Sequence, residues 1–156
     1  MKETEIANPD VVRYIVKRFN LRASKKWGQN FLIRPQVVRD IAAAAGVRNG
    51  DPVLEIGPGI GTLTQALAET GADITAVEID GRLLPILAKT LEKYDNVRII
   101  HGDIMKTDIA AEMKYEPFTV CANLPYYITT PVIMRLLEEK LSIRRMSWCR
   151  KKWPNG

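Results

Sequence analysis

The sequence predicts an α/β protein with a parallel sheet, and three observations support this prediction. From residue 52 onward, short apolar runs alternate with longer segments of helical period, as in chains where each strand is followed by a helix. The apolar runs are rich in β-branched residues, which favours buried parallel strands joined by right-handed crossovers. After the first run, residues 57–61 place glycine at every second position, which is typical of a tight turn that a ligand approaches closely.

Two helices are expected ahead of the sheet. Asn8-Pro9-Asp10 predicts a helix entry, and apolar residues recur from there at helical spacing as far as Asn20. Residues 22–32 show no period and predict an ordered loop. Pro35 opens a second helix with one apolar face, and Gly46 closes it.

The alternating region predicts four strands, each followed by a helix. The strands are 52–56, 73–77, 97–101 and 118–122, and the helices are 63–69, 82–93, 109–113 and 131–139. The chain therefore divides into N-terminal helices with a basic loop (1–50), a partial Rossmann-like core (51–143) and a basic tail (144–156). The tail shows neither a strand period nor a helical face.

Composition is that of an ordinary soluble globular chain, because 46% of the 156 residues are apolar and 26% are charged. No apolar run approaches the length of a membrane span, and the N-terminus lacks the pattern of a signal peptide. The two cysteines have no metal-ligand spacing, which fits a reducing compartment. We therefore expect a cytoplasmic protein without a bound metal.

The net charge of +5 is unevenly distributed. Residues 1–50 carry ten basic and four acidic side chains, residues 51–143 carry eight and fourteen, and residues 144–156 carry five and none. A positive N-terminal face, including Lys25 and Lys26, could contact RNA phosphates. A solvated helix surface explains the same charge equally well.

Ligands of open parallel sheets lie outside the carboxyl ends of the strands. The candidate residues just past the predicted strands are Gly57, Gly59, Glu78, Asp103 and Asn123. Each of them taken alone is also typical of a cap or a turn. Together they predict one site at the carboxyl edge of the sheet.

The spacing within this set indicates a nucleoside. Glu78 follows Gly57 by 21 positions, close to the spacing at which an acid accepts hydrogen bonds from ribose hydroxyls. A nicotinamide dinucleotide would fit this spacing, but Thr62 replaces the third glycine of its fingerprint and no nearby group suits a pyrophosphate. Asp103 could accept from an adenine amino group. A ligand with adenine and ribose but no phosphate, such as S-adenosylmethionine, fits better.

Residues 123–127 then suggest the chemistry. In Asn-Leu-Pro-Tyr-Tyr, the proline restrains the backbone, Asn123 offers an amide oxygen and an aromatic ring can stack on a flat substrate. The Asn123 oxygen and the Leu124 carbonyl could accept both N–H bonds of an exocyclic amine. They would stabilise the charge that develops as a methyl group arrives, without a general base or a metal.

Three motifs carry a resemblance to a known family. Lys-Lys-Trp-Gly-Gln-Asn-Phe-Leu at 25–32, Glu-Ile-Gly-Pro-Gly at 55–59 and Asn-Leu-Pro-Tyr at 123–126 resemble the small-subunit ribosomal RNA adenine N6,N6-dimethyltransferases over about residues 10–143. The resemblance implies a class I methyltransferase fold and S-adenosylmethionine as methyl donor. It implies two adjacent adenines near the 3′ end of small-subunit RNA as substrate, in the 30S pre-ribosomal particle, and we expect a monomer.

The resemblance also assigns roles by position. It implies cofactor contacts for Asn30, Leu32, Gly57, Gly59, Glu78, Asp103 and Asn123. It places the target adenine against Asn123, Leu124, Pro125 and Tyr126, with Tyr126 as the stacking partner.

Past Leu141 the resemblance stops, whereas family members continue through further strands and a helical domain. Restoring one G after a codon for Met146 converts residues 146–156 to Met-Val-Val-Val-Gln-Lys-Glu-Val-Ala-Glu-Arg, an apolar strand and a helix start, which resembles the family. We therefore hypothesise a single-base deletion. Without a fifth strand, the sheet would be incomplete, the strand that carries Asn123 would have an unpaired edge, and the chain would be weak or inactive.

Three alternatives to the small-subunit enzyme remain at this point. One is the related large-subunit 23S RNA adenine methyltransferase that confers macrolide resistance, which shares these motifs. Another is a non-catalytic RNA-binding or ribosome-assembly factor that uses the basic N-terminal face. The third alternative, a nicotinamide dehydrogenase, has the weakest support, because the sequence shows no evident acid or base for hydride transfer.

Overall fold

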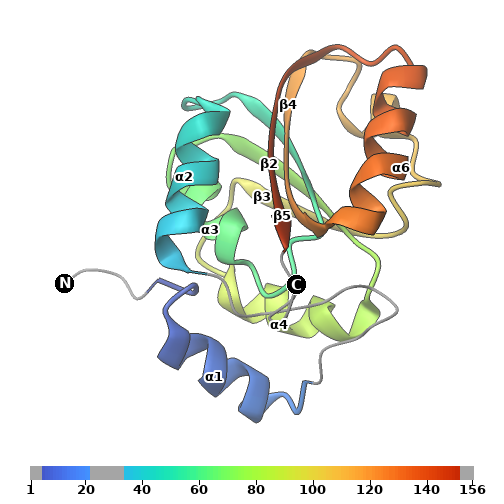
Figure 1. The fold of residues 1–156 in the computed structure, drawn as a ribbon. Helices are drawn as coiled ribbons and strands as arrows, with labels where there is room; N and C mark the ends of the chain where they lie inside the picture. Colours follow the sequence, from blue (N-terminus) through green and yellow to red (C-terminus); the bar gives the residue numbers. More distant parts are fainter. Residues whose placement is uncertain (1–4, 22–33, 152–156) are drawn as a thin grey trace.

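Five parallel strands form the sheet at the centre of the molecule. The computed structural model describes residues 5–21 and 34–151, and Figure 1 shows the sheet between two layers of helices. The strands lie in the order β3-β2-β1-β4-β5. Their bounds are β1 Pro52–Ile56, β2 Asp73–Glu78, β3 Val97–His101, β4 Phe118–Pro125 and β5 Ile143–Lys151. The predicted α/β fold with a parallel sheet is confirmed.

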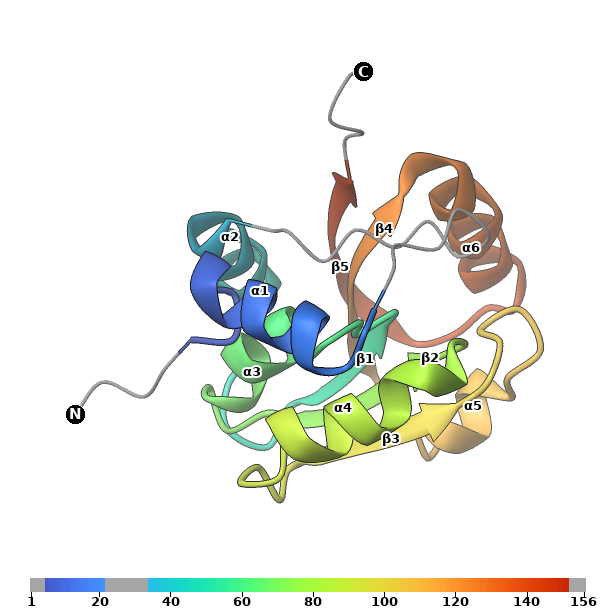
Figure 2. The same ribbon diagram turned by 90° about the horizontal axis from the view of Figure 1, so that it is seen from below.

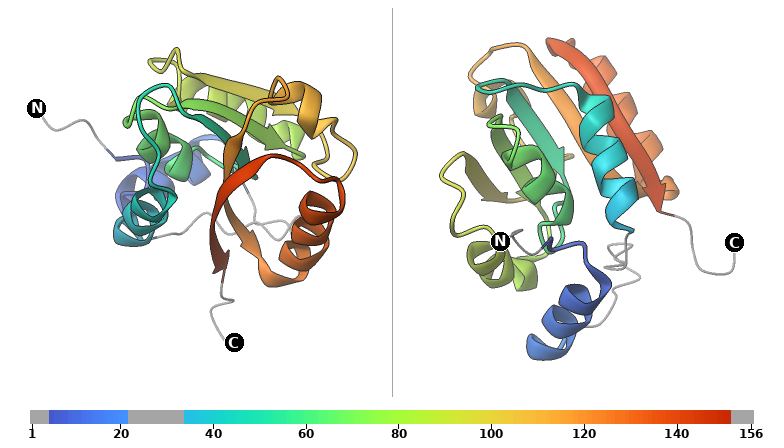
Figure 3. Two further views of the ribbon diagram at one scale, coloured as in Figure 1. Left: turned by 90° about the horizontal axis from the view of Figure 1, so that it is seen from above. Right: turned by 90° about the vertical axis from the view of Figure 1, so that its left-hand side faces the viewer.

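Helices cover both faces of the sheet (Figure 3). On one face lie α2 (Pro35–Ala45), α3 (Thr62–Ala68), the short 3-10 helix η1 (Gly81–Leu83) and α4 (Leu84–Thr90), and on the other lie α5 (Ile109–Glu112) and α6 (Tyr126–Glu138). Alternate strand residues serve the two layers, because successive side chains of a strand point to opposite faces. Val53 packs in the α2/α3 core, whereas Leu54 packs in the α5/α6 core.

The N-terminal helix α1 (Pro9–Arg18) begins as the sequence predicts. The Asn8 side chain accepts a hydrogen bond from the amide of Asp10 at 2.9 Å, and proline occupies the first turn. Its buried residues Val12 and Ile15 pack with α4 and with Ile60 of the glycine turn. Figure 2 shows α1 beside α4 at this end of the sheet.

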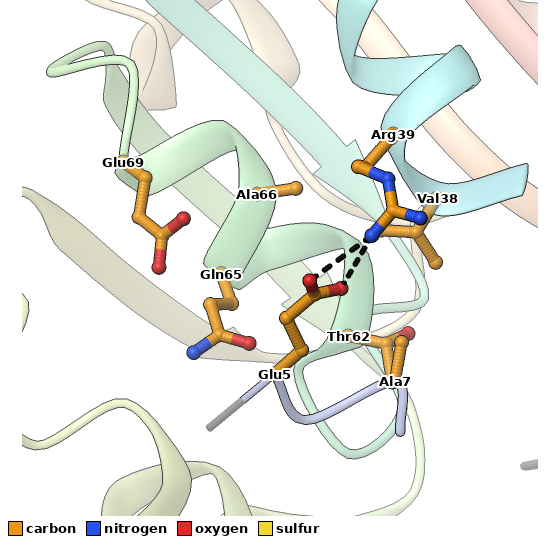
Figure 4. A pocket seen from close by; sticks show the side chains of 8 residues that line it. All are labelled: Glu5, Ala7, Val38, Arg39, Thr62, Gln65, Ala66 and Glu69. Atoms are coloured by element: carbon orange, nitrogen blue, oxygen red, sulfur yellow. Dashed lines mark hydrogen bonds and ion pairs between the residues drawn. The ribbon is translucent and has the colours of Figure 1, made fainter. Parts of the chain in front are cut away.

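The segment before α1 is fastened to the core. The Ile6 amide donates to the buried Gln65 Oε1 at 2.7 Å, and Arg39 Nη1 contacts both carboxylate oxygens of Glu5. Figure 4 shows the latter pair in a hollow of about 340 Å³ between this segment, α2 and α3. No helix in the described ranges is long and apolar enough to cross a membrane.

The last predicted helix was placed too late in the chain. We expected it to begin at Pro131, but α6 begins at Tyr126 and Pro131 lies inside it. β4 runs three residues beyond the predicted end and leads directly into the helix at Pro125, which is the N-cap. Proline is most typical of a first helical turn, so a proline deeper in the helix gave a misleading start signal.

The tail contains a strand, so the expectation of an unpaired β4 edge was wrong. Residues 143–151 form β5, which pairs with β4 in parallel from Phe118 opposite Ile143 to Pro125 opposite Lys151. Ser147 Oγ donates to the Ile41 carbonyl of α2 at 2.7 Å. Among the described strands, the sheet edge on this side therefore lies at β5, one strand away from Asn123.

Candidate functional site

The strand register brings the central site residues to one level. Ile56 pairs with Val77 of β2 and with Ala122 of β4. The residues that follow Ile56, Val77 and Ala122 are Gly57, Glu78 and Asn123. These three therefore lie side by side at the carboxyl edge of the sheet. This is the edge where open parallel sheets bind ligands.

The glycine turn joins β1 to α3 and keeps its backbone open on one side. Gly57 and Gly59 have φ values of +71° and +62°, a region that favours glycine. A Cβ on Gly57 would lie 2.7 Å from Leu124 Cδ2, so the turn is in close contact with the end of β4, where residues 123–126 form the Asn-Leu-Pro-Tyr motif (the β4 motif). A Cβ on Gly59 would meet no atom of the described residues within 4 Å. None of these residues covers this side of the Gly59 backbone, so a ligand can approach it closely.

Glu78 links the turn to the end of β2. Its carboxyl is buried, with the residue 4% exposed, and accepts from the Gly59 amide on Oε1 and from the Asp80 amide on Oε2, both at 3.0 Å. Burial raises the pKa of Glu78, and these two hydrogen bonds oppose that rise. Because a carboxylate oxygen can accept more than one hydrogen bond, each oxygen retains capacity for a hydroxyl donor.

Glu55 is a residue of this region that the sequence reasoning did not assign to the site. It lies in β1 beneath the glycine turn, 1% exposed, and its Oε1 accepts from the Thr64 hydroxyl of α3. Burial, and secondarily the charge of Glu78, raise the pKa of Glu55 to about 8, although the Thr64 hydrogen bond lowers it. The sequence does contain a signal for Glu55, because it is a single acid inside an otherwise apolar strand. A carboxyl in such a place is expected either to accept a hydrogen bond from a partner or to be protonated.

Glu55 should make stability pH-dependent. A carboxyl whose pKa rises from 4.5 to about 8 on folding binds more protons in the folded state, so its contribution to stability is lost as pH rises through that window. We expect Glu55→Gln to remove a slope of about 1 kcal/mol per pH unit. Urea unfolding at pH 5.5, 6.5 and 7.5 measures how the free energy of unfolding changes with pH. Glu138→Gln, an exposed control, should keep the slope, and parallel profiles for all three proteins would contradict the expectation.

Asp103 and Asn123 complete the described part of the site. Asp103 follows β3 by two residues; its Oδ1 accepts from the Met105 amide and its carbonyl from the Lys106 amide, both at 2.9 Å, which folds the following loop into a turn. Asn123 is partly exposed and makes no side-chain hydrogen bond with any residue that the structure describes. Its amide is therefore available to a ligand.

Several predicted site residues lie outside the described part of the chain. They are Lys25, Lys26, Asn30 and Leu32. The description of Tyr126 is confined to its backbone, at the first position of α6. Leu124 and Pro125 lie in β4 beside Asn123, as the motif requires. In residues 5–21 and 34–151, no group of three or more His, Cys, Asp or Glu could hold a metal ion.

Comparisons with known proteins relate the whole described core to one family. The family model described as ribosomal RNA adenine dimethylase matches residues 8–151. The ribosomal RNA small subunit methyltransferase A of Geobacillus thermodenitrificans is 50% identical, over 91% of this chain and 50% of that protein. The protein of the same name from Enterococcus faecalis is 45% identical over the same shares. The chain thus spans about half the length of the curated relatives it matches.

Solved structures extend the likeness to the fold. The 23S rRNA methyltransferase ErmE is 34% identical, with a TM-score of 0.66 over 75% of this chain and 47% of that one. A dimethyladenosine transferase from Plasmodium falciparum is 32% identical, with a TM-score of 0.58 over 69% of this chain and 38% of that one. The family match also continues past residue 143, where the sequence resemblance was expected to end.

Proposed function

Because the chain belongs to the ribosomal RNA adenine dimethylase family, we propose that it binds S-adenosylmethionine and transfers methyl groups to N6 of two adjacent adenines near the 3′ end of small-subunit ribosomal RNA. The observation that carries this proposal is that Gly57, Glu78 and Asn123 lie side by side at one sheet edge. This arrangement places groups that suit a nucleoside next to an amide that can accept a hydrogen bond from an amine.

The described residues fit the cofactor. The Gly59 backbone, which no described residue covers on one side, can be approached closely by a ligand, and the buried Glu78 carboxylate can accept from ribose hydroxyls. Asp103 can accept from the adenine amino group, while Ile104, which is buried at the start of the same loop, can border the ring. S-adenosylmethionine would supply a methyl group already activated on a sulfonium. We extend the cofactor contacts by position to Asn30 and Leu32.

The residues of the β4 motif act on the target amine. Asn123 Oδ1 and the Leu124 carbonyl accept the two N6–H bonds, which localises the nitrogen lone pair and stabilises the positive charge that develops on N6. The bound cofactor would supply the methyl group, its C–S bond breaking as the new N–C bond forms, and N6 would give up one proton to solvent. Pro125 restrains the backbone of the motif, and the Tyr126 ring is proposed to stack on the adenine.

Cofactor binding is tested by removing the Glu78 carboxylate. We expect Glu78→Ala to raise the dissociation constant for S-adenosylmethionine by about 30-fold or more, because charge-assisted hydrogen bonds to the ribose contribute about 2 kcal/mol or more. Isothermal titration calorimetry measures the constant. Glu116→Ala, at the opposite edge of the sheet, is the matched control and should bind as the unsubstituted chain does. Equal affinities for all three proteins would refute a ribose role for Glu78.

Small-subunit RNA is the proposed partner, and Lys25 and Lys26 are proposed to contact its phosphates. We propose that the protein acts in the cytoplasm as a monomer. The likeness to ErmE supports a second candidate, methylation of 23S RNA. Transfer of labelled methyl groups to 30S particles and to 23S RNA, assayed in parallel, separates the two. RNA binding without transfer to either would favour an assembly factor.

We also propose that a single-base deletion produced the basic composition after Met146. The restored frame would give an apolar strand at the position where β5 lies. The nucleotide sequence downstream of this codon tests the proposal, because the other frame should encode the rest of a methyltransferase. A frame without such a continuation would refute it.

A further inference from the structure

Arg135 of α6 is a largely buried cation whose surroundings connect two parts of the site. Its side chain is 15% exposed. Nη2 donates to the Thr107 carbonyl at 2.6 Å, and Nε donates to Glu139 Oε1 at 2.8 Å. Nη1 is buried and has no hydrogen-bond partner in the described part of the chain. Burying a guanidinium is unfavourable unless its geometry is well satisfied, so this placement calls for a role.

Thr107 belongs to the loop that carries Asp103. Its hydroxyl donates to the Asp103 carbonyl at 2.7 Å, and the Lys106 amide donates to the same carbonyl at 2.9 Å. The Thr107 carbonyl, which Arg135 holds, is therefore part of the same turn as the Asp103 backbone. Arg135 therefore holds this turn through the carbonyl of Thr107, which lies four residues after Asp103 in the chain.

At its other end, α6 continues from the β4 motif without a loop. Pro125 is the N-cap of α6, and the Thr129 hydroxyl donates to the Pro125 carbonyl at 3.0 Å. Arg135 lies on the same helix, so its guanidinium joins the element that follows Asn123 to the loop that carries Asp103. The part of the site proposed for the adenine of the cofactor and the part proposed for the methyl-accepting amine are thereby held at a fixed separation.

We propose that Arg135 is a positioning residue that holds the Asp103 loop against α6 and so sets the preference of the site for a 6-amino purine. The proposal rests on the proposed function, because it assumes that Asp103 accepts from the adenine amino group. A 6-oxo purine lacks that donor, so a correctly placed Asp103 discriminates against it. Displacement of the loop should weaken this discrimination more than it weakens binding in general.

The test compares S-adenosylhomocysteine with S-inosylhomocysteine, using calorimetry on the full chain. The unsubstituted chain should prefer the adenosine form, and Arg135→Met should reduce the ratio of the two dissociation constants by about tenfold, the effect of one lost charge-assisted hydrogen bond. Arg135→Lys keeps a cation and one donor and should restore part of the ratio. Glu139→Gln alters the other partner of Arg135 and should leave the ratio unchanged.

Amide hydrogen exchange gives a second measurement that needs no ligand. Arg135→Met should accelerate exchange of the Met105 and Lys106 amides by about tenfold while the β1 amides keep their rates, because only the local turn is released. Uniform acceleration, or an equal loss of affinity for both ligands, would show a merely structural role and overturn the inference. If the unsubstituted chain binds neither ligand, the result refutes the proposed function. The inferred purine preference, which depends on that function, is then refuted as well.

Discussion

Replacing Asn123 by alanine is expected to reduce methyl transfer to small-subunit RNA by about 10²- to 10³-fold, the typical effect of removing one group that stabilises transition-state charge. The side chain of Asn123 has no partner in the described protein, so its loss leaves no buried group unsatisfied. Cofactor affinity should change by less than about tenfold, because Glu78 and Asp103, the proposed nucleoside contacts, are unchanged.

Single-turnover assays with excess protein and labelled S-adenosylmethionine measure this rate even where turnover is weak. Asn49→Ala, at an exposed loop position, is the matched control and should transfer methyl groups at the original rate. Calorimetry on both variants separates chemistry from binding. Undiminished transfer by Asn123→Ala would rule out the proposed role of this amide.

Removing residues 144–156 is expected to abolish cooperative folding. The deletion exposes the outer edge of β4 and removes Met146 and Trp148, which pack against the α5/α6 core. It also removes the Ser147 hydrogen bond to α2. Loss of several partly buried side chains and a strand pairing should amount to about 5 kcal/mol or more, which is comparable with the whole stability of an ordinary domain.

Thermal unfolding followed by circular dichroism measures this loss. Ser147→Ala provides a graded comparison, because it deletes one buried hydrogen bond and should lower the unfolding free energy by about 1 kcal/mol. A deleted chain that melts at the original temperature would show that β5 contributes nothing to the fold. It would also restore the expectation of a sheet that ends at β4.

Local patterns explain why most of the fold was predictable. Asn8 and Pro9 set the start of α1 through contacts within one turn, and the apolar runs of β1, β2 and β4 follow from burial on both faces. The placement of Glu78 and Asn123 beside Gly57 followed from a rule on parallel sheets, and the register confirms it.

β5 was missed because its period is interrupted. The pairing shifts between Phe118 and Thr119, so that Ile143 and Arg145 face consecutive residues of β4 and Arg144 is the extra residue of a bulge. Ile143 therefore falls out of step with Met146 and Trp148, although all three pack against one core. A period-2 pattern read along the sequence cannot include such a residue.

The sequence alone determined the α/β class, the glycine turn and the set of polar residues at the strand ends, because these depend on local backbone preferences and on the burial of whole segments. The tertiary structure decided that part of the basic tail pairs with β4 as a fifth strand, that Glu55 lies buried beneath the turn and that Arg135 reaches the Asp103 loop. These features depend on contacts between residues far apart in the chain, whose partners supply the burial, the hydrogen bonds and the register that no local pattern contains.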